Sequence, residues 1–304
     1  MTWVSVIIPT YDRAERVTRA VSSVLAQTYT DFELIVVDDG SGDATLRSLT
    51  PFRDRIRLLR HGRNRGVSTA RNTGIRASSA PLVAFLDSDD RWFPEKLQVQ
   101  TRFFLENPDA QACQTQEIWV RHGRRVNPAR RHLKPSGNIF EPSLERCLVS
   151  PSAVMLRRSL LDEVGLFDES LPVCEDYDLW LRIACRHPIH LIDRELLVRE
   201  GGHPDQLSAR GPGLDRYRIQ ALVGVLRSAR LSASQARAAL EALRRKSRIY
   251  AEGCLKRGRN REGGYYQTLP DRIARGERFP FPPPEAETRR AGETGVWTGD
   301  GAGA

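Results

Sequence analysis

Short runs of β-branched residues alternate with helical patterns through the first ninety residues, and this alternation limits the chain to few folds. The runs VSVIIP (Val4 to Pro9) and FELIVVDDGS (Phe32 to Ser41) are mostly apolar and end in turn-forming residues, as strands buried on both faces do. Between them, apolar residues recur at helical spacing (Val17, Val21, Val24 and Leu25). Repetition of this unit predicts an α/β fold with a mostly parallel central sheet flanked by helices.

The alternation continues and then changes. Ile56 to Leu59 and Leu82 to Leu86 read as further strands, with a helix from Val67 to Ser78 between them. Later elements are shorter and strand-like, which indicates antiparallel additions. From Leu214 the chain is helical, and we expect this helical extension to cover residues 211–262. Residues 279–304 are dense in Pro, Gly, Glu and Thr, and we expect them to be disordered.

Composition points to an anionic partner. The 304 residues carry a formal net charge of +9, which suits a nucleotide, a nucleic acid or an acidic membrane surface. The five cysteines are scattered and never spaced as CxxC, so neither a zinc site nor a disulfide framework is indicated. No secretory signal and no stretch of about 20 apolar residues is found. We therefore expect a cytoplasmic protein, with peripheral contact at the inner face of an anionic membrane left open.

The stretch LVAFLDSDD (Leu82 to Asp90) ends a predicted strand with three carboxylates in four positions. Repulsion and desolvation oppose such a cluster, so it is either a solvated turn or the site of a cation. Asp87 and Asp89 can point the same way in extended structure, with Ser88 pointing away. Two carboxylates suit a divalent cation that takes its other ligands from water and a diphosphate.

Three more segments hold candidate side chains. Asp38 and Asp39 end a strand, where a carboxylate can bind a base or a ribose, although DDGS also forms Asx turns readily. In NRGVSTARNTGI, Arg71 and Asn72 lie near a predicted helix N-terminus, which favours phosphate; a plain surface helix is the alternative. In CEDYDLWLRIACR, an apolar stripe leaves the acidic pair Glu175 and Asp176 at the first turn, where such residues also complement a helix dipole.

The motifs SVIIPTYDR, SVLAQTYTDFELIVVDDGSGD, GVSTARNTGI, FLDSDD and CEDYDLWLRIA, in this order, resemble the family-2 glycosyltransferases with the GT-A fold. The likeness covers roughly residues 4–203. It implies a catalytic domain over residues 1–210, with a nucleotide-binding half (1–110) and an acceptor half (111–210). It also implies inverting transfer of a sugar, often from a UDP-linked donor, with Mn²⁺ or Mg²⁺ as cofactor. The acceptor, whether a saccharide, a lipid-linked group or a protein, is left open.

The resemblance also implies residue roles. Asp89 would be the direct metal ligand, Asp87 would lie nearer the ribose, and His203 in GGHPDQLS would complete the metal's coordination or touch the diphosphate. Asp176 would be the catalytic base, with Glu175 as the alternative, since a base must accept the acceptor hydroxyl's proton during transfer. The expected nucleotide-binding residues are Pro9, Thr10, Tyr11, Asp12, Asp39, Arg71, Asp87 and Ser88. Asp12 stands where the family often has Asn, a change that would tune contacts to the base.

Two other functions compete with this interpretation. A nucleotidyltransferase would share the fold class and a carboxylate-bound metal, but it should have a Gly-rich, basic loop where this chain has PTYDRAER. A non-catalytic nucleotide- or nucleic-acid-binding module would fit the charge. Nucleic acid is disfavoured because the basic runs Arg121 to Lys134 and Arg244 to Arg261 lack the interleaved aromatic residues of single-strand binders.

Overall fold

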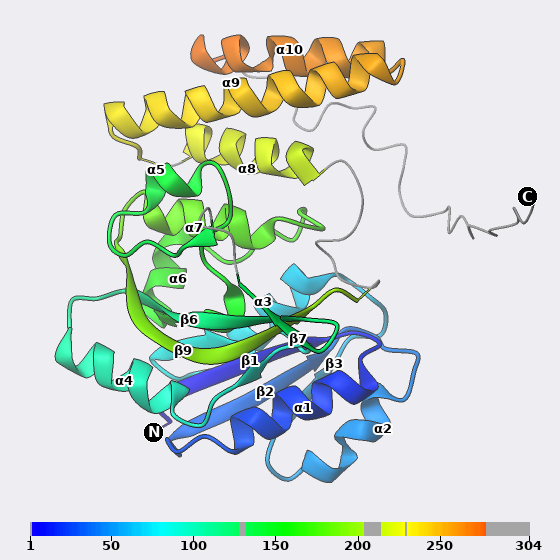
Figure 1. Ribbon diagram of the computed structural model, residues 1–304, viewed down its shortest axis with the longest axis vertical. Coiled ribbons are helices and arrows are strands. Elements are labelled where there is room, and N and C mark those ends of the chain that lie inside the picture. The colour runs from blue at the N-terminus through cyan, green and yellow to red at the C-terminus, as the bar shows by residue number, and fades with distance from the viewer. Residues whose placement is uncertain (1, 128–131, 204–213, 229, 278–304) are drawn as a thin grey trace, which may run out of the picture.

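The computed structural model describes residues 2–127, 132–203, 214–228 and 230–277. Figure 1 shows a central sheet with helices on both faces and further helices stacked beyond one of them. The predicted tail at 279–304 lies outside the described residues. The strands are β1 (Val4–Thr10), β2 (Phe32–Asp38), β3 (Arg57–Arg60), β4 (Leu82–Phe85), β5 (Arg91–Trp92), β6 (Ala112–Arg121), β7 (Arg124–Val126), β8 (Val154–Arg157) and β9 (Ile189–Gly201).

Helices cover both faces of the sheet. They are α1 (Ala14–Leu25), α2 (Thr45–Leu49), α3 (Val67–Ala77), α4 (Lys96–Glu106), α5 (Phe140–Ser143), α6 (Arg158–Val164), α7 (Glu175–Ala184), α8 (Leu214–Ser228), α9 (Ala233–Lys256) and α10 (Asn260–Ala274). Val17, Val21 and Val24 of α1 are fully buried in one apolar cluster against the sheet, as their spacing predicts. A second cluster on the opposite face includes Ile75 of α3 and Trp180 of α7.

The first four strands form the parallel part of the sheet. β1 lies between β2 and β4, and β3 pairs with β2, all in parallel. Every residue of β1 is buried, which explains why its sequence is apolar without alternation. Because parallel strands end at the same edge, the segments that follow β1, β2 and β4 meet there.

The rest of the sheet is mixed. The order is β3-β2-β1-β4-β8-β6-β9-β5, with β7 paired to β6. β8 runs antiparallel to both β4 and β6, whereas β6 and β9 are parallel and shift register twice between Thr115 and Ile118. Of the eight described strand pairings, four are antiparallel. The α/β fold class is confirmed, and its parallel character is concentrated in the first half of the chain.

The C-terminal extension is longer than expected. We expect it to end at residue 262, but α10 continues the helical structure to Ala274 and packs along α9 (Figure 1). Two adjacent glycines and Pro270 weaken the helical pattern of α10. Burial compensates, because the rings of Tyr250 and Tyr266 pack 4.6 Å apart and Leu269 is fully buried. Within the described residues, no helix is long and apolar enough to cross a membrane.

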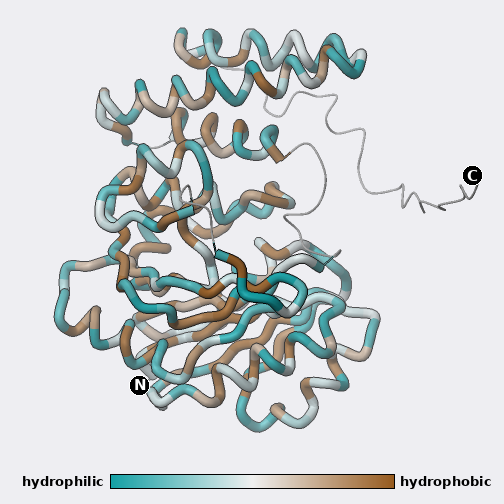
Figure 2. Tube along the Cα trace, in the orientation of Figure 1, coloured by the Kyte–Doolittle hydropathy of each residue, from teal (hydrophilic) through white to brown (hydrophobic). Residues whose placement is uncertain are grey.

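Figure 2 shows where apolar residues gather along the trace. The strands of the central sheet are predominantly brown, whereas the outer helices of the extension alternate between brown and teal. On α9 the buried positions are small or amphipathic, such as Ala239, Ala242 and Tyr250. The extension therefore adds amphipathic layers to one face of the α/β core.

Candidate active site

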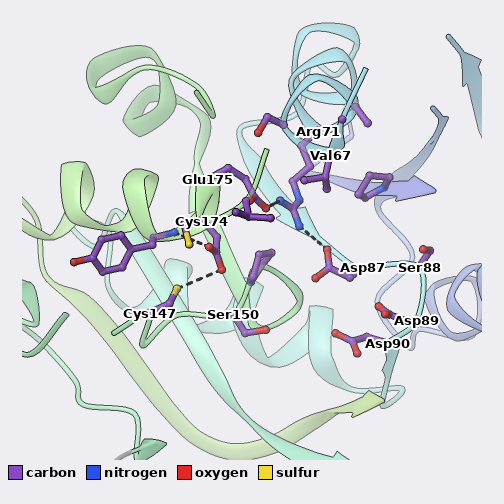
Figure 3. A pocket seen from close by; sticks show the side chains of 18 of the residues that line it. Val67, Arg71, Asp87, Ser88, Asp89, Asp90, Cys147, Ser150, Cys174 and Glu175 are labelled. Carbon is purple, nitrogen blue, oxygen red and sulfur yellow. Dashed lines mark hydrogen bonds and ion pairs between the residues drawn. The ribbon is translucent and has the colours of Figure 1, made fainter. Parts of the chain in front are cut away.

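A cavity of about 1230 Å³ lies at the carboxyl ends of the parallel strands and extends toward the N-terminus of α7. Its walls include segments that follow β1, β2 and β4, the start of α3, and residues of β6 and β9. In Figure 3, Asp87, Ser88, Asp89 and Asp90 lie on one side of this cavity and Cys147, Cys174 and Glu175 on the other. The fold thus brings the acidic strand end and the acidic helix start to one space.

The three carboxylates after β4 have different surroundings. Asp87 accepts a hydrogen bond from Arg71 at 2.7 Å and remains partly exposed. Asp90 is buried, where its Oδ2 accepts from the Ser152 hydroxyl at 2.6 Å and its Oδ1 from the Glu200 amide at 3.0 Å. Burial, followed by the charges of Asp89 and Asp87, raises the pKa of Asp90 well above its usual value. Asp90 therefore connects β4 to the neighbouring strands, and only Asp87 and Asp89 remain for a ligand.

Asp89 has basic groups beside it. Its Oδ2 lies 3.0 Å from His203 Nε2 and 3.7 Å from Arg13 Nη1. Burial and the charge of Asp87 raise its pKa, while Arg13 and His203 oppose the rise. His203 follows β9, so the fold brings together two residues that lie far apart in the sequence, and the expected role of His203 at a metal stays a prediction.

The donor set here suits a divalent cation shared with a bound ligand. A carboxylate and an imidazole nitrogen within 3.0 Å are both ligands that Mn²⁺ accepts. Among the residues that the structure describes, no group of three His, Cys, Asp or Glu side chains could hold a metal by itself. A metal at Asp89 would therefore take most of its ligands from water and phosphate, which is the usual situation for Mg²⁺ at nucleotides.

Asp39 lines the cavity, but its carboxylate also organises the polypeptide around it. It accepts hydrogen bonds from the backbone amides of Arg65 and Gly66, the latter at 2.8 Å, and pairs with His61 Nδ1 at 2.7 Å. Asp38 points away from the cavity and lies 3.5 Å from Arg60 Nε. Asp39 thus fixes the start of α3 against the end of β2.

The segment after β1 forms the facing wall. Pro9, Thr10, Tyr11 and Asp12 all line the cavity, and Tyr11 is exposed. Asp12 has a φ of 49°, a left-handed conformation that Asp and Asn tolerate better than most residues. Its Oδ1 accepts from the Gly42 amide at 2.8 Å, so it joins this wall to the segment after β2. One oxygen of the Asp12 carboxylate is thus bonded to backbone, and the expected effect of Asp12 on contacts to a base stays a prediction.

Gly40 lies between these two walls, where its φ is 79°. A Cβ at this position would come within 2.5 Å of the Arg63 backbone carbon, which is too close for any side chain. Glycine is therefore required for the segment after β2 to pass the segment before α3.

Arg71 lines the cavity, and its guanidinium is paired within the protein. It is only 3% exposed, and its two terminal nitrogens donate to Asp87 and Glu175, both at 2.7 Å. Its guanidinium also lies over the Phe167 ring, 5.1 Å from the centroid. The neighbouring Asn72 donates to the Phe167 carbonyl oxygen at 2.8 Å. Both residues face inward, so Arg71 is an internal link between the acidic segment and α7.

Asp176 and Glu175 occupy different environments at the start of α7. Glu175 is buried and paired with Arg71; burial raises its pKa, Arg71 opposes the rise, and Asp176 adds to it. Asp176 lines the cavity, accepts a hydrogen bond from the Tyr177 amide and lies 3.3 Å from the Cys147 sulfur. Of the two candidates for the base, Asp176 is the one whose carboxylate is open to a ligand.

The structure adds cavity residues that the sequence analysis did not single out. Glu117 on β6 pairs with Lys134 Nζ at 2.8 Å and lies 3.6 Å from Arg199 Nη1. Arg146 and Arg218 line the cavity near α7. Lys134 belongs to a basic run that was noted, but nothing in that run indicates which of its side chains faces the cavity.

The fold and this cavity define an α/β protein that binds a ligand at the carboxyl ends of its parallel strands. The family model for glycosyl transferase family 2 matches residues 5–165, which is more than half of the chain. The chain therefore belongs to glycosyl transferase family 2 and has the GT-A fold.

Individual proteins similar to this chain support the same family. Over 191 residues the chain is 35% identical to the UDP-Glc:alpha-D-GlcNAc-diphosphoundecaprenol beta-1,3-glucosyltransferase WfgD of Escherichia coli, covering 62% of this chain and 73% of WfgD. It is 36% identical to an uncharacterized glycosyltransferase of Rickettsia felis, covering 64% of this chain and about a third (32%) of that protein. The crystal structure of S. aureus TarS 1-349 in complex with UDP-GlcNAc matches with a TM-score of 0.61 and 19% identity, covering 91% of this chain and 93% of TarS 1-349.

Proposed function

We propose that this chain transfers a sugar from a nucleoside diphosphate donor, UDP-linked, to an acceptor hydroxyl with inversion at the anomeric carbon. The observation that carries the proposal is one cavity lined by both Asp89 and Asp176, with His203 Nε2 3.0 Å from the Asp89 carboxylate. The relative from E. coli is named for a UDP-Glc donor, and the TarS structure contains UDP-GlcNAc. Both names support a UDP-linked donor for this chain.

In this proposal the donor binds along the strand ends. Pro9, Thr10 and Tyr11 would form one side of the base pocket, and Asp39 would accept a hydrogen bond from the base through a lone pair that its backbone partners leave. Asp87 and Ser88 would lie beside the ribose. Asp12 and Arg71 would contribute by holding these walls in position. A cavity fixed in this way binds with little loss of conformational entropy.

Asp89 and His203 would hold Mn²⁺ or Mg²⁺. The cation, when bound, would neutralise the charge that develops on the departing diphosphate. At the opposite side, Asp176 would accept the proton of the acceptor hydroxyl as its oxygen bonds to the anomeric carbon. A single displacement inverts that centre, and no covalent intermediate with the protein forms.

The donor is identified by a screen of UDP-, GDP- and dTDP-linked sugars that measures release of nucleoside diphosphate. Calorimetry with UDP then tests the metal: we expect UDP to bind in the presence of Mn²⁺ and to lose at least about tenfold affinity without it. Asp89→Ala should bind UDP equally weakly with and without Mn²⁺. Asp54→Ala, on an exposed carboxylate far from the cavity lining, is the control. If Asp89→Ala kept its Mn²⁺-dependent affinity for UDP, the segment Asp87 to Asp90 would be a solvated turn and not a metal site.

A further inference from the structure

Two arginines lie at the end of the cavity where Asp176 is found. The Cys147 sulfur lies 3.3 Å from Asp176 Oδ2, and Arg146, the residue before Cys147, lines the same cavity. Arg218 of α8 also lines it. Its charge acts to lower the pKa of Cys174, which places the guanidinium close to the start of α7. Two arginines from separate segments of the chain thus line the cavity.

Arg218 retains hydrogen-bonding capacity. Its Nη1 pairs with Asp215 at 3.2 Å, one helical turn earlier, and its side chain is 31% exposed. A guanidinium has five N–H donors, so a single contact with Asp215 leaves most of them available. Asp215 is absent from the cavity lining, and Arg218 therefore presents positive charge toward the cavity.

Arg146 has no hydrogen bond or ion pair with any residue that the structure describes. Its neighbour Glu145 pairs instead with Arg245 on α9. On the other side, Glu175 is neutralised by Arg71. Asp176 thus lines the same cavity as Arg146 and Arg218, and of these two arginines only Arg218 has a carboxylate partner among the described residues, Asp215.

We propose that Arg146 and Arg218 bind a phosphate group carried by the acceptor. The inference rests on the proposed function, because it takes Asp176 as the base that receives the acceptor's hydroxyl. An anionic acceptor would be repelled by Asp176 alone, and two guanidinium groups overcome that repulsion. Guanidinium is well matched to phosphate because it donates two parallel hydrogen bonds to its oxygens. In the proposed function the donor's diphosphate would lie near Asp89, which Figure 3 shows on the other side of the cavity from Cys147.

The helical extension would then take part in substrate selection. Arg218 and Leu214 of α8 line the cavity, although both lie beyond the segment of 5–165 that matches the family model. A family member with a different extension would present different side chains at this place. The phosphate could belong to a lipid-linked sugar or to a soluble phosphate-containing saccharide, and both would be recognised by the same chemistry.

The test uses n-octyl phosphate and glycerol 1-phosphate, with n-octyl glucoside and glycerol as their uncharged counterparts. Each is titrated by calorimetry into the full chain, with and without saturating UDP and Mn²⁺. We expect both phosphates to bind when UDP and Mn²⁺ are present, and the uncharged compounds to bind at least about tenfold more weakly. Arg146→Gln and Arg218→Gln should each weaken phosphate binding by about 10- to 100-fold. The exposed α9 residue Arg237, changed to Gln, is the matched control.

The outcomes are separable. Tighter binding of octyl phosphate indicates a lipid-linked acceptor, and equal or tighter binding of glycerol 1-phosphate indicates a soluble one. If neither phosphate binds, or if both arginine variants bind them as the wild type does, the proposal is overturned. Failure of UDP to bind with Mn²⁺ would instead count against the proposed function, and the arginine dependence of phosphate binding would still decide the inference. Unchanged UDP affinity in the two variants shows that they are folded.

Discussion

The donor side and the acceptor side of the cavity use charge in different ways. On the donor side, Asp39 is held by backbone amides and His61, and Arg71 is shared between Asp87 and Glu175. On the acceptor side, Arg146 has no described partner and Arg218 has one carboxylate at 3.2 Å. Internal pairing fixes the geometry of a site, whereas unpaired charge is available to a ligand. The comparison suggests a rigid donor site facing an acceptor site whose charge selects the substrate.

The extent of the family match follows this division only in part. Residues 5–165 include the walls after β1, β2 and β4, and Arg146 as well, whereas Asp176, His203 and Arg218 lie beyond them. The following predictions are ordered by expected effect.

The largest effect should come from Asp176→Asn. The amide keeps the size of the side chain but cannot accept the proton, so we expect turnover to fall by 10²- to 10⁴-fold, about 3–5 kcal/mol in activation free energy. UDP affinity should stay within a factor of about three, since the change is on the acceptor side. Steady-state kinetics measures the turnover, and calorimetry measures the UDP affinity. A variant with full activity would remove Asp176 as the base.

The sequence predicts the site residues of the donor side better than those of the acceptor side. The donor-side residues lie in short motifs after predicted strands, and parallel topology requires those strand ends to be adjacent, so Asp39, Asp87 and Asp89 could be grouped in advance. The burial of the Arg71 side chain could not be predicted from the sequence, because a surface arginine and a buried arginine can occupy the same helical position. Its burial depends on Phe167 and Glu175, about 100 positions away.

The side chains on the acceptor side were harder to predict, because their positions also depend on contacts between residues far apart in the sequence. Arg146 follows a short helix and Arg218 belongs to the extension, so only tertiary packing brings them to α7. Likewise α10 was missed because Gly263, Gly264 and Pro270 weaken its local signal, while the Tyr250–Tyr266 contact that stabilises it is a tertiary feature.

The second prediction tests the internal pairing of the donor side. Arg71→Met should destabilise the protein by about 3–5 kcal/mol, because it leaves the buried Glu175 carboxylate without its counter-ion. Adding Glu175→Gln to this variant should restore part of the loss, since the uncompensated charge is removed. Urea unfolding at pH 7 measures all three proteins. A loss below about 1 kcal/mol for Arg71→Met would mean that the link between Asp87 and Glu175 contributes little, and the contrast between the two sides would weaken.

The third and smallest prediction concerns an internal ion pair on the acceptor side, between Glu117 and Lys134. Glu117 is buried, which alone would raise its pKa, but Lys134 at 2.8 Å and then Arg199 hold the pKa at about 2. An unfolded glutamate titrates near ~4.3, so between these values the unfolded state binds more protons than the folded state. The pair therefore stabilises the fold fully above that range, by roughly 3 kcal/mol, and this contribution is lost as the pH falls toward 2.

Glu117→Gln should remove that dependence, so its free energy of unfolding should change less between pH 5 and 2 than that of the wild type. Glu106→Gln, which alters an exposed pair with Arg102, is the control and should follow the wild-type curve. Urea unfolding across this pH range makes the measurement. If the free energy of unfolding of Glu117→Gln changed with pH as that of the wild type does, the charges of Lys134 and Arg199 would not be neutralised by Glu117. They would then join Arg146 and Arg218 as charge available to an acceptor, and the positive end of the cavity would extend across β6 and β9.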